Sequence, residues 1–343
     1  MFVYYSIFCF IIYCTIFFNS TSQTVAISFF IYRYYILFFA AYFISKIFNQ
    51  TSIDNLFDII IKCYLLQCAI TLASYFIPAF GDFIFSIQQD ASGDIFRFLR
   101  AVGLGFGFDG GAMELSLVMI ILVYKMLNNK NNGFYLFCLF FFMFTGLFVA
   151  RTIFIGILFN ILFYFIYTNT KNKATIKNNK IKLFIFALLS ICIVIIVLFL
   201  LYQKYQDLID WMLQMFKHKK DSTQPNTFDI LFGKMYFHLE DSTLLIGDGM
   251  FTENGKLNGI YYKRTDAGYM RILLLGGIPL LISYFVIEFT YFFGLYIKYK
   301  NYRKIWFLFL LADYVFFIKI IVFPVAPMAL LFLNKKEHKN EIL

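Results

Sequence analysis

The sequence is short of charged residues, histidine and proline. Only 15% of its 343 residues are charged, and it contains three histidines, five prolines and two tryptophans. Soluble domains are about 25% charged, so this composition excludes a soluble enzyme and a disordered tail. The histidines form no H-x-x-x-H pair, which argues against a zinc site built from the protein. We therefore expect no metal and no cofactor.

Cysteine is present, but in no arrangement typical of chemistry. The cysteines lie within apolar runs and form no C-x-x-C motif. We interpret them as small buried apolar residues and not as disulfide partners or metal ligands, which excludes a secreted disulfide scaffold. They are Cys9, Cys14, Cys63, Cys68, Cys138 and Cys192.

Apolar residues are what the sequence has in excess. Hydrophobic residues make up 61% of the chain, Phe alone fills 49 positions, and the mean hydropathy is +0.73. A bilayer core of about 30 Å needs about 20 helical residues. We therefore predict an all-α, polytopic integral membrane protein in which residues 1–343 form a single membrane domain. The apolar runs lie at 2–18, 24–45, 56–80, 101–127, 134–150, 152–168, 183–202 and 267–297, with a last stretch at 305–333.

The last apolar stretch, 305–333, has two interpretations. It contains Lys319, Pro324 and Pro327, so it is either one long tilted helix or a hairpin of two short helices. We favour the hairpin because it returns the basic C-terminal tail to the cytoplasm. The result is a bundle of about ten spans with both termini cytoplasmic and one large external loop, 203–266.

Lysine and arginine are distributed differently in this layout. Thirty basic against twenty acidic residues give a net charge of +10. In a soluble protein that excess indicates nucleic acid as a partner, but in a membrane protein it mostly records topology, and we expect no nucleic-acid partner. The lysines fall mainly on alternate, cytoplasmic connections, whereas six of the seven arginines fall outside or in the outer half of a span. Because Arg binds phosphate oxygens with a planar fork of donors, this bias indicates an anionic ligand on the outer face.

Two external stretches supply arginines. In 97–111, Arg97 and Arg100 precede five glycines and Asp109, and the glycines allow a broken helix and close approach of the backbone to a ligand. The alternatives are helix packing through glycine and ion pairs between these arginines and nearby aspartates. Arg151 lies at the tip of a short outer hairpin, level with the lipid phosphates, or serves there as a snorkelling anchor.

The external loop 203–266 contains two predicted helices. Apolar residues recur at helical spacing over 205–216, which predicts an amphipathic helix on the membrane surface. A second short helix is expected over 228–239. We expect both to cover the site and to take no part in the chemistry.

The most informative block is 247–277. It runs from Gly247-Asp248-Gly249 through Arg264 and Asp266 to Arg271 and a Gly-Gly pair. Arg271 lies one to two turns inside the eighth span, where an unpaired charge is costly, so it is expected to face a cavity or a partner. A salt bridge between Asp266 and Arg271 is disfavoured because their spacing is not i, i+4.

Taken together, these patterns resemble the O-antigen and capsular polysaccharide repeat-unit polymerases of bacterial envelopes. The likeness consists of R-x-x-G at 100–103, Arg151 at an outer hairpin, a large late external loop, and G-x-G…D-x-G-Y-x-R-x-L-x-x-x-G from Gly247 to Gly277. The related O-antigen ligases share the layout but usually carry a histidine late in this loop. Here His218 and His238 lie early in it, which favours a polymerase over a ligase.

The resemblance implies a metal-independent glycosyltransferase at the outer face of a bacterial plasma membrane. Its partners would be polyprenyl-diphosphate-linked oligosaccharides and the lipid bilayer, with a chain-length regulator as a further candidate. Arginines would neutralise the leaving diphosphate without a metal. The diphosphate candidates are Arg97, Arg100, Arg151, Arg264 and Arg271.

The same resemblance assigns roles to acidic and aromatic residues. Asp266 is the first choice for the base that accepts the proton of the acceptor hydroxyl, followed by Glu240 and His238. Asp248, Tyr262, Tyr269 and Asp109 are expected to bind sugar or to set loop geometry, although Tyr near a membrane interface is often an anchor.

The main alternative from another class is a lipid-linked oligosaccharide flippase or transporter, which would use the outer arginines to capture substrate. Transporters typically show internal repeats and ionisable residues near the bilayer midplane. No repeat is visible in this sequence, and Glu288, Asp313 and Lys319 are the few ionisable residues at such positions.

Overall fold

Helices are the regular elements of the residues that the structure describes. The computed structural model describes residues 2–21, 30, 32–88, 101–104, 108–128, 133–168, 231–253, 255, 261–319, 321 and 330–332. Within these ranges no β-strand forms, although Thr252 and Tyr261 make an isolated antiparallel bridge. The all-α prediction is therefore confirmed. The chain divides into two compact units, one from residues 1–56 and 228–343 and the other from residues 57–227.

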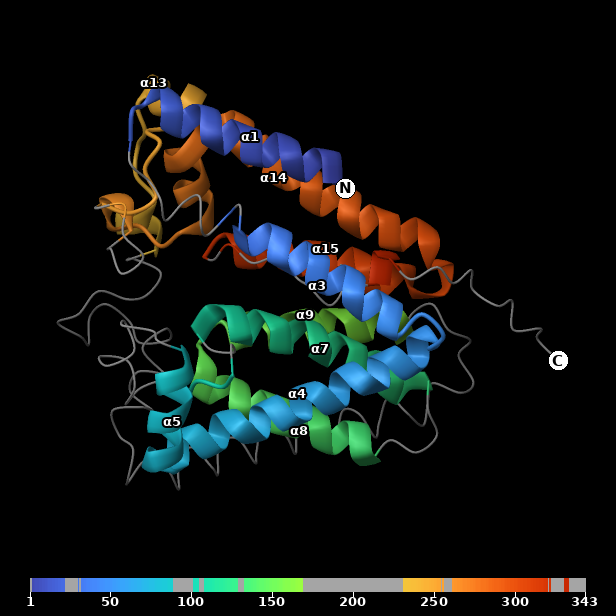
Figure 1. The fold of residues 1–343 in the computed structure, drawn as a ribbon. Helices are drawn as coiled ribbons and strands as arrows, with labels where there is room; N and C mark the ends of the chain where they lie inside the picture. Colours follow the sequence, from blue (N-terminus) through green and yellow to red (C-terminus); the bar gives the residue numbers. More distant parts are fainter. Residues whose placement is uncertain are drawn as a thin grey trace. The chain divides into compact units, whose positions relative to one another are not determined.

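The first unit joins the two ends of the chain. α1 (Phe2–Phe18) runs along α14 (Gly268–Lys298), and α15 (Arg303–Phe317) packs on the same long helix (Figure 1). α3 (Arg33–Ile47) and the short α13 (Asp241–Ile246) complete its helices. Large aromatic side chains fill the space between α14 and α15, among them the fully buried Tyr284, Phe292, Trp306 and Phe309.

The second unit consists of α4 (Ile53–Phe76, whose first turn belongs to the first unit), α5 (Pro78–Gln88), α7 (Phe108–Asn128), α8 (Gly133–Val149) and α9 (Ile153–Thr168). α7 packs against both α8 and α9 (Figure 1). Gly156 of α9 allows this close approach, because a Cβ at Gly156 would lie within 2.4 Å of the Cβ of Ser116 on α7.

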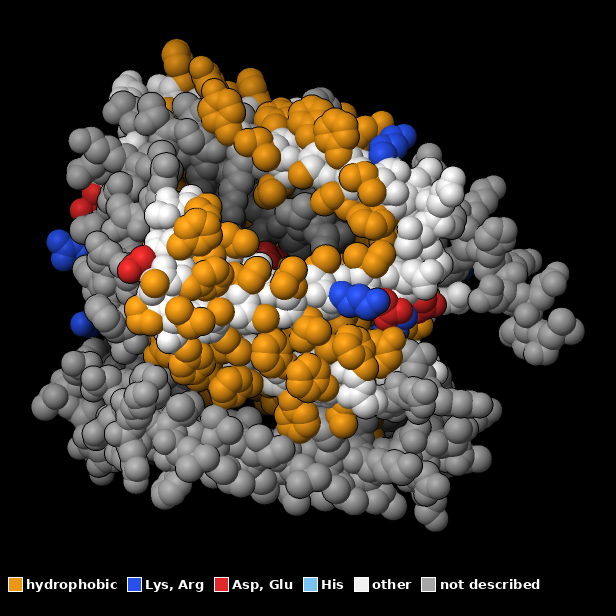
Figure 2. All heavy atoms as spheres, turned by 60° about the horizontal axis from the view of Figure 1, so that its bottom comes forward, with side chains coloured by type: hydrophobic (Ala, Val, Ile, Leu, Met, Phe, Trp, Pro, Cys, Tyr) orange, Lys and Arg blue, Asp and Glu red, His pale blue; other side chains and the backbone are white. Residues whose placement is uncertain are grey.

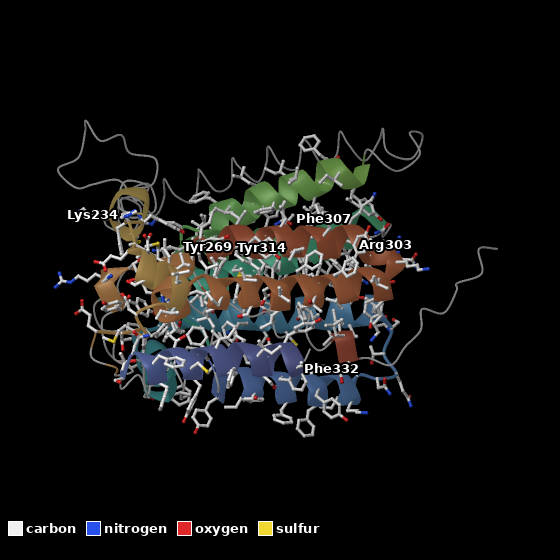
Figure 3. All side chains as sticks on the ribbon, turned by 90° about the horizontal axis from the view of Figure 1, so that it is seen from above. Lys234, Tyr269, Arg303, Phe307, Tyr314 and Phe332 are labelled. Atoms are coloured by element: carbon white, nitrogen blue, oxygen red, sulfur yellow. The ribbon has the colours of Figure 1, made fainter. Side chains whose placement is uncertain are left out.

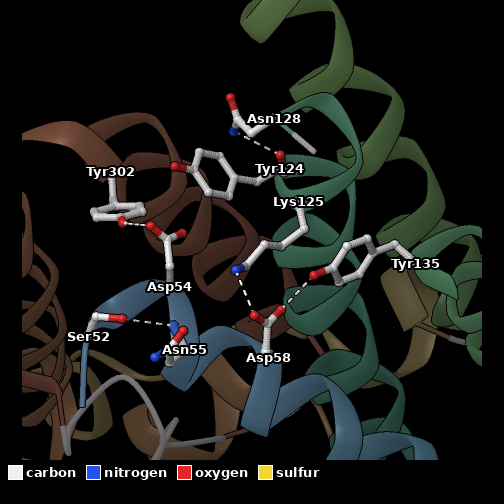
Figure 4. Close-up of polar contacts among 9 residues, drawn as sticks. All are labelled: Ser52, Asp54, Asn55, Asp58, Tyr124, Lys125, Asn128, Tyr135 and Tyr302. Atoms are coloured by element: carbon white, nitrogen blue, oxygen red, sulfur yellow. Dashed lines mark hydrogen bonds and ion pairs between the residues drawn. The ribbon is translucent and has the colours of Figure 1, made fainter. Parts of the chain in front are cut away.

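Polar contacts tie helices together within each unit (Figure 4). In the second unit, Lys125 of α7 pairs with Asp58 of α4 at 3.0 Å, and the Tyr135 hydroxyl of α8 donates to the same carboxylate at 3.0 Å. In the first unit, the Tyr302 hydroxyl donates to Asp54 at 2.9 Å. Lys125 is 5% exposed, so this lysine stabilises helix packing in addition to any effect on orientation.

The helices have the length and surface of a membrane protein. Three described helices are long and apolar enough to cross a bilayer: Ile53–Phe76, Asp109–Asn128 and Gly268–Lys298. The other apolar helices of the described ranges have fewer residues, so the predicted count of about ten spans is not reached there. Hydrophobic side chains cover much of the face drawn in Figure 2. Phe10 and Phe17 of α1, Leu66 of α4 and Leu158 of α9 are exposed, as expected of side chains that contact lipid.

Several predicted boundaries differ from the observed ones. The run 56–80 ends as a helix at Phe76, and Pro78 begins the separate α5, because proline is favoured at a helix start and breaks a helix interior. The run 101–127 does not begin as a helix. Residues 101–104 are irregular, and their carbonyls accept hydrogen bonds from Ser74 and Gln67 of α4, which replaces helical bonding.

Two further predictions change near the C-terminal end. The helix expected over 228–239 is not formed by its described residues, because 231–235 form a π-helical turn and 236–239 are not helical; the regular helix α13 begins at Asp241. α15 ends at Phe317 and Ile318 and Lys319 form a turn, so one continuous helix over 305–333 is excluded. The amphipathic helix at 205–216, the span at 183–202 and most of the second helix of the expected hairpin lie outside the described residues.

Candidate functional site

The segment that leads into α14 is held by glycine. Gly247 and Gly277 adopt φ/ψ of 74°/169° and 65°/−163°, a region that is essentially restricted to glycine. They also approach each other closely, because a Cβ at Gly247 would lie 2.5 Å from the Gly276 nitrogen and a Cβ at Gly277 would lie 2.7 Å from the Leu244 carbonyl oxygen. α13 is therefore fixed against a break in α14.

That break frees a helical carbonyl for the loop. Gly276 and Gly277 interrupt α14, and the Leu274 carbonyl, which a continuous helix would pair with residue 278, instead accepts a 2.7 Å hydrogen bond from the Asp248 N–H. Under the loop, Leu239, Ala267, Met270 and Leu274 form a small buried cluster. The loop and the first turns of α14 thus form one packed structure.

The end of α1 fastens the same loop. Asn19 donates to the Gly247 carbonyl at 3.3 Å, and Thr21 donates to the Gly249 carbonyl at 2.9 Å. Phe30 packs edge-on against Phe251 with ring centroids 5.2 Å apart. Both ends of the chain therefore determine the conformation of the loop.

Asp248 organises the polar side of the loop. Its carboxylate accepts a hydrogen bond from the Thr243 hydroxyl and pairs with Lys263 at 3.2 Å. Burial, together with the neighbouring Asp248 carboxylate, raises the pKa of Tyr262 above its usual value. Lys263 and Arg264 both have positive φ, at 52° and 54°, so this turn is strained. The arrangement gives Asp248 and Tyr262 a role in loop geometry.

Arg271 lies buried where this loop meets α14. It is 6% exposed, and its Cζ lies 4.4 Å from the ring centroid of Phe251 and 3.8 Å from that of Tyr261. The aromatic faces compensate part of the desolvation of the guanidinium. Nε and Nη2 are buried and have no hydrogen-bond partner among the residues that the structure describes. A guanidinium in this state retains two directed donors for an anion.

The Asp266 carboxylate lies within electrostatic range of this guanidinium, but among the described residues no ion pair joins the two side chains. The ion pair of Asp266 is made with Lys319, whose Nζ donates to Oδ2. Its other oxygen, Oδ1, is buried and unpartnered within the described part of the chain. The Tyr236 hydroxyl donates to the Ile318 carbonyl next to Lys319 at 2.8 Å, and burial, with lesser effects of Tyr269 and Asp266, raises the pKa of Tyr236 to about 12.

Other predicted site residues of the first unit lie apart from this pair. Glu240 and His238 are exposed on the segment before α13. The Arg264 side chain is 79% exposed and lies 3.9 Å from Glu253. Tyr269 of α14 and Tyr314 of α15 lie close together (Figure 3), and the Tyr269 hydroxyl donates to the Tyr314 carbonyl at 2.9 Å. The Tyr269 ring also packs on Phe317. Packing between α14 and α15 therefore occupies Tyr269.

The remaining predicted residues belong elsewhere in the chain. Arg151 and Asp109 are part of the second unit, where Thr152, the neighbour of Arg151, donates to Asp109 at 3.0 Å. Arg97 and Arg100 lie outside the described residues. Within the described ranges, no group of three or more His, Cys, Asp or Glu side chains is placed to hold a metal ion.

Two charged residues of the site were not among the sequence predictions. Lys263 pairs with Asp248 and Lys319 pairs with Asp266. Lys319 had a signal in the sequence, since it is a charged residue in a long apolar run, but nothing in its spacing indicated a partner 53 positions away.

No protein-family model matches the chain, and neither a curated protein nor a solved structure shows significant similarity to it.

Proposed function

We propose that the chain is a membrane glycosyltransferase that joins polyprenyl-diphosphate-linked oligosaccharide repeat units. The product is O-antigen or capsular polysaccharide, made at the outer face of a bacterial plasma membrane. The observation that carries this proposal is the buried Arg271 guanidinium, which keeps Nε and Nη2 unpaired within the described residues and lies within electrostatic range of the Asp266 carboxylate. An anion-binding donor pair near a carboxylate suits the departure of a diphosphate and the activation of a hydroxyl.

The proposed reaction transfers the growing glycan from one lipid diphosphate to the incoming unit. An acceptor hydroxyl oxygen forms a bond to the anomeric carbon of the donor glycan, and the bond from that carbon to the diphosphate oxygen breaks. The diphosphate leaves with the electron pair, and Arg271 stabilises its growing negative charge. Asp266 accepts the hydroxyl proton through Oδ1, while Lys319 holds Oδ2 and fixes the orientation of the carboxylate.

Other residues extend this proposal. Arg97, Arg100, Arg151 and Arg264 are further candidates for the diphosphates of the two substrates, and a chain-length regulator is the expected protein partner. Glu240 and His238 are exposed and rank behind Asp266 as base, because a proton acceptor must lie within hydrogen-bond reach of the hydroxyl beside the diphosphate.

The test compares two arginines in a strain that lacks the chain and is complemented with variants. Arg271→Lys is expected to lower long-chain polymer about a hundredfold, because loss of one preorganised donor to a developing oxyanion lowers rates by roughly 10² to 10³ and an ammonium cannot replace the fork. Arg303→Lys is the matched control, because Arg303 donates to the Tyr296 carbonyl on the predicted cytoplasmic side, and it should keep most of the polymer. Immunoblots of the membrane fraction confirm equal amounts of each variant.

The glycan pattern of the deletion strain separates the three functions. Single-repeat lipid-linked units that accumulate outside the membrane support the polymerase. Intact polymer that is not attached to its final acceptor indicates an O-antigen ligase, and units retained inside indicate a flippase. A normal ladder from Arg271→Lys at normal protein level would remove the diphosphate role.

A further inference from the structure

A pair of carboxyl groups lies in the interior of the first unit, away from the site described above. Glu288 of α14 and Asp313 of α15 are each 2% exposed, and their carboxyl groups lie within hydrogen-bonding reach of each other. The second oxygens, Glu288 Oε2 and Asp313 Oδ2, are buried and without a hydrogen-bond partner among the described residues. Two ionised carboxylates are both acceptors only, so a hydrogen bond between them requires a proton.

Among the described residues, the basic group nearest the pair along the chain is Lys319, six positions after Asp313, and its Nζ is paired with Asp266. The basic residues of α1, α14 and α15 lie at helix ends, namely Arg271, Lys298, Arg303 and Lys304. The nearest of these along each helix is nine or ten positions from a carboxyl, about 13–15 Å at 1.5 Å per residue. In the described ranges neither carboxyl forms an ion pair with Lys, Arg or His. The titratable groups that interact electrostatically with the two carboxyls are neutral tyrosines, and the thiol of Cys9 neighbours one of them, Tyr5. These tyrosines are Tyr5 of α1, Tyr269, Tyr284 and Tyr291 of α14, and Tyr314 of α15.

We propose that Glu288 and Asp313 form a proton-binding site between α14 and α15. The pair holds one proton on the line between the two carboxyl groups. Two carboxylates within hydrogen-bonding reach of each other in an apolar interior are too unfavourable for both to be ionised. Because both carboxyl groups are buried, the proton can leave only when water reaches the pair.

This site is independent of the glycosyltransferase proposal. It uses residues of the helix interior, whereas the proposed catalysis uses the start of α14 and the turn after α15. It also bears on the alternative function, since a proton site within membrane helices is a feature of transporters.

Infrared spectroscopy of the purified full chain at neutral pH tests the site directly. The wild-type protein is expected to show the carbonyl band of a protonated carboxylic acid. The band should shift from water to heavy water more slowly than the exchange of exposed groups. A wild-type spectrum without this band overturns the proposal, whether or not any variant folds.

Variants assign the band. Glu288→Gln and Asp313→Asn are each expected to remove or shift it, and the double variant should abolish it. Glu114→Gln is the matched control, because Glu114 is the carboxylate that accepts the Tyr64 hydroxyl in the second unit, and it should leave the band unchanged. A band that persists in the double variant overturns the assignment of a proton to this pair. A sodium ion is the alternative occupant of two carboxylates, so a wild-type band that appears only when sodium is removed from the buffer also overturns it.

Discussion

At the scale of single residues, Arg271 is unusual in what it lacks. A buried donor without a partner destabilises a fold by about 1–3 kcal/mol, and more when it is charged. The contacts with Phe251 and Tyr261 return about 2 kcal/mol for a desolvated cation. The two aromatic contacts therefore offset only part of the cost of burying this guanidinium without an anion. An anion that pairs with its free donors would remove the rest of that cost, which favours binding of the anion.

Tyr261 offers a way to test that balance separately from catalysis. Tyr261→Leu removes the closer of the two aromatic faces, 3.8 Å from the guanidinium carbon. We expect the folded protein to lose roughly 1–2 kcal/mol of stability, measured as a lower thermal midpoint in detergent. Added inorganic diphosphate should recover part of this loss. Equal effects of diphosphate and chloride would argue against a directed anion site.

Asp266 is the residue on which the proposed proton transfer depends. Asp266→Asn keeps the size of the side chain and removes the base, so turnover should stop while lipid-linked substrate still binds. The measurement is polymer formation from purified lipid-linked units, together with substrate binding. Glu253→Gln is the control, because Glu253 is exposed, has no proposed role in the reaction and should keep its activity. Full turnover by Asp266→Asn would exclude Asp266 as the base.

Tyr236 predicts a pH dependence of stability. Its pKa is raised to about 12 in the folded chain, whereas the unfolded value is near 10. Between these values the unfolded state loses its proton first, so the contribution of Tyr236 is complete below pH 10 and decreases as the pH rises toward 12. Tyr236→Phe should therefore show a smaller decrease in thermal midpoint from pH 10 to pH 12. Tyr13→Phe, which alters an exposed ring, should follow wild type.

At the scale of elements, the break in α14 fixes the position of the candidate site. Gly277→Ala places a Cβ 2.7 Å from the Leu244 carbonyl oxygen at a backbone conformation that only glycine adopts easily. A stability loss of roughly 2 kcal/mol or more is expected, with loss of polymer. Gly294→Ala lies on the same helix, where a Cβ would meet only the end of the Leu331 side chain, and it should be neutral or slightly stabilising. Similar thermal midpoints for both variants would contradict the proposed role of the break.

Helix bounds were predictable where a long apolar run ends at polar or small residues. The runs 2–18, 134–150 and 152–168 correspond to α1, α8 and α9 within one residue at most ends. A helix that is apolar on all sides has no periodicity to interrupt, so the break at Gly276 and Gly277 was visible only as the two glycines and the nearby Pro279, which disrupts helical hydrogen bonding. The break also depends on the packing of α13, which a linear pattern does not contain.

The candidate site was predictable in its location but not in its pairing. The block 247–277 was identified from its charges and glycines, and Arg271 was expected to face a cavity or a partner. The pairing of Asp266 with Lys319 and of Arg271 with two aromatic rings depends on how α14 and α15 pack. The spacing of these residues along the sequence does not indicate which of them are in contact in the fold.

At the scale of the whole molecule, the excess of apolar residues is explained by a membrane environment. Helices long enough to cross a bilayer and exposed apolar side chains on several helices agree with it. The predicted topology places Gln50 in the cytoplasm and Ser242 outside. A membrane-impermeant thiol reagent applied to intact cells should therefore label Ser242→Cys and not Gln50→Cys. After lysis both should react, and labelling of Gln50→Cys in intact cells would reverse the orientation.

The hydrogen bonds from Asn19 to Gly247 and from Thr21 to Gly249 join positions 228 residues apart. During synthesis α1 emerges first, and at about 5–20 residues per second its partners follow on the order of ten to fifty seconds later. Over that interval the end of α1 has no loop to bind. The nascent chain must therefore keep this first helix available until the loop at 247–249 has been translated, and the candidate site can form only after translation has passed Lys319, the partner of Asp266.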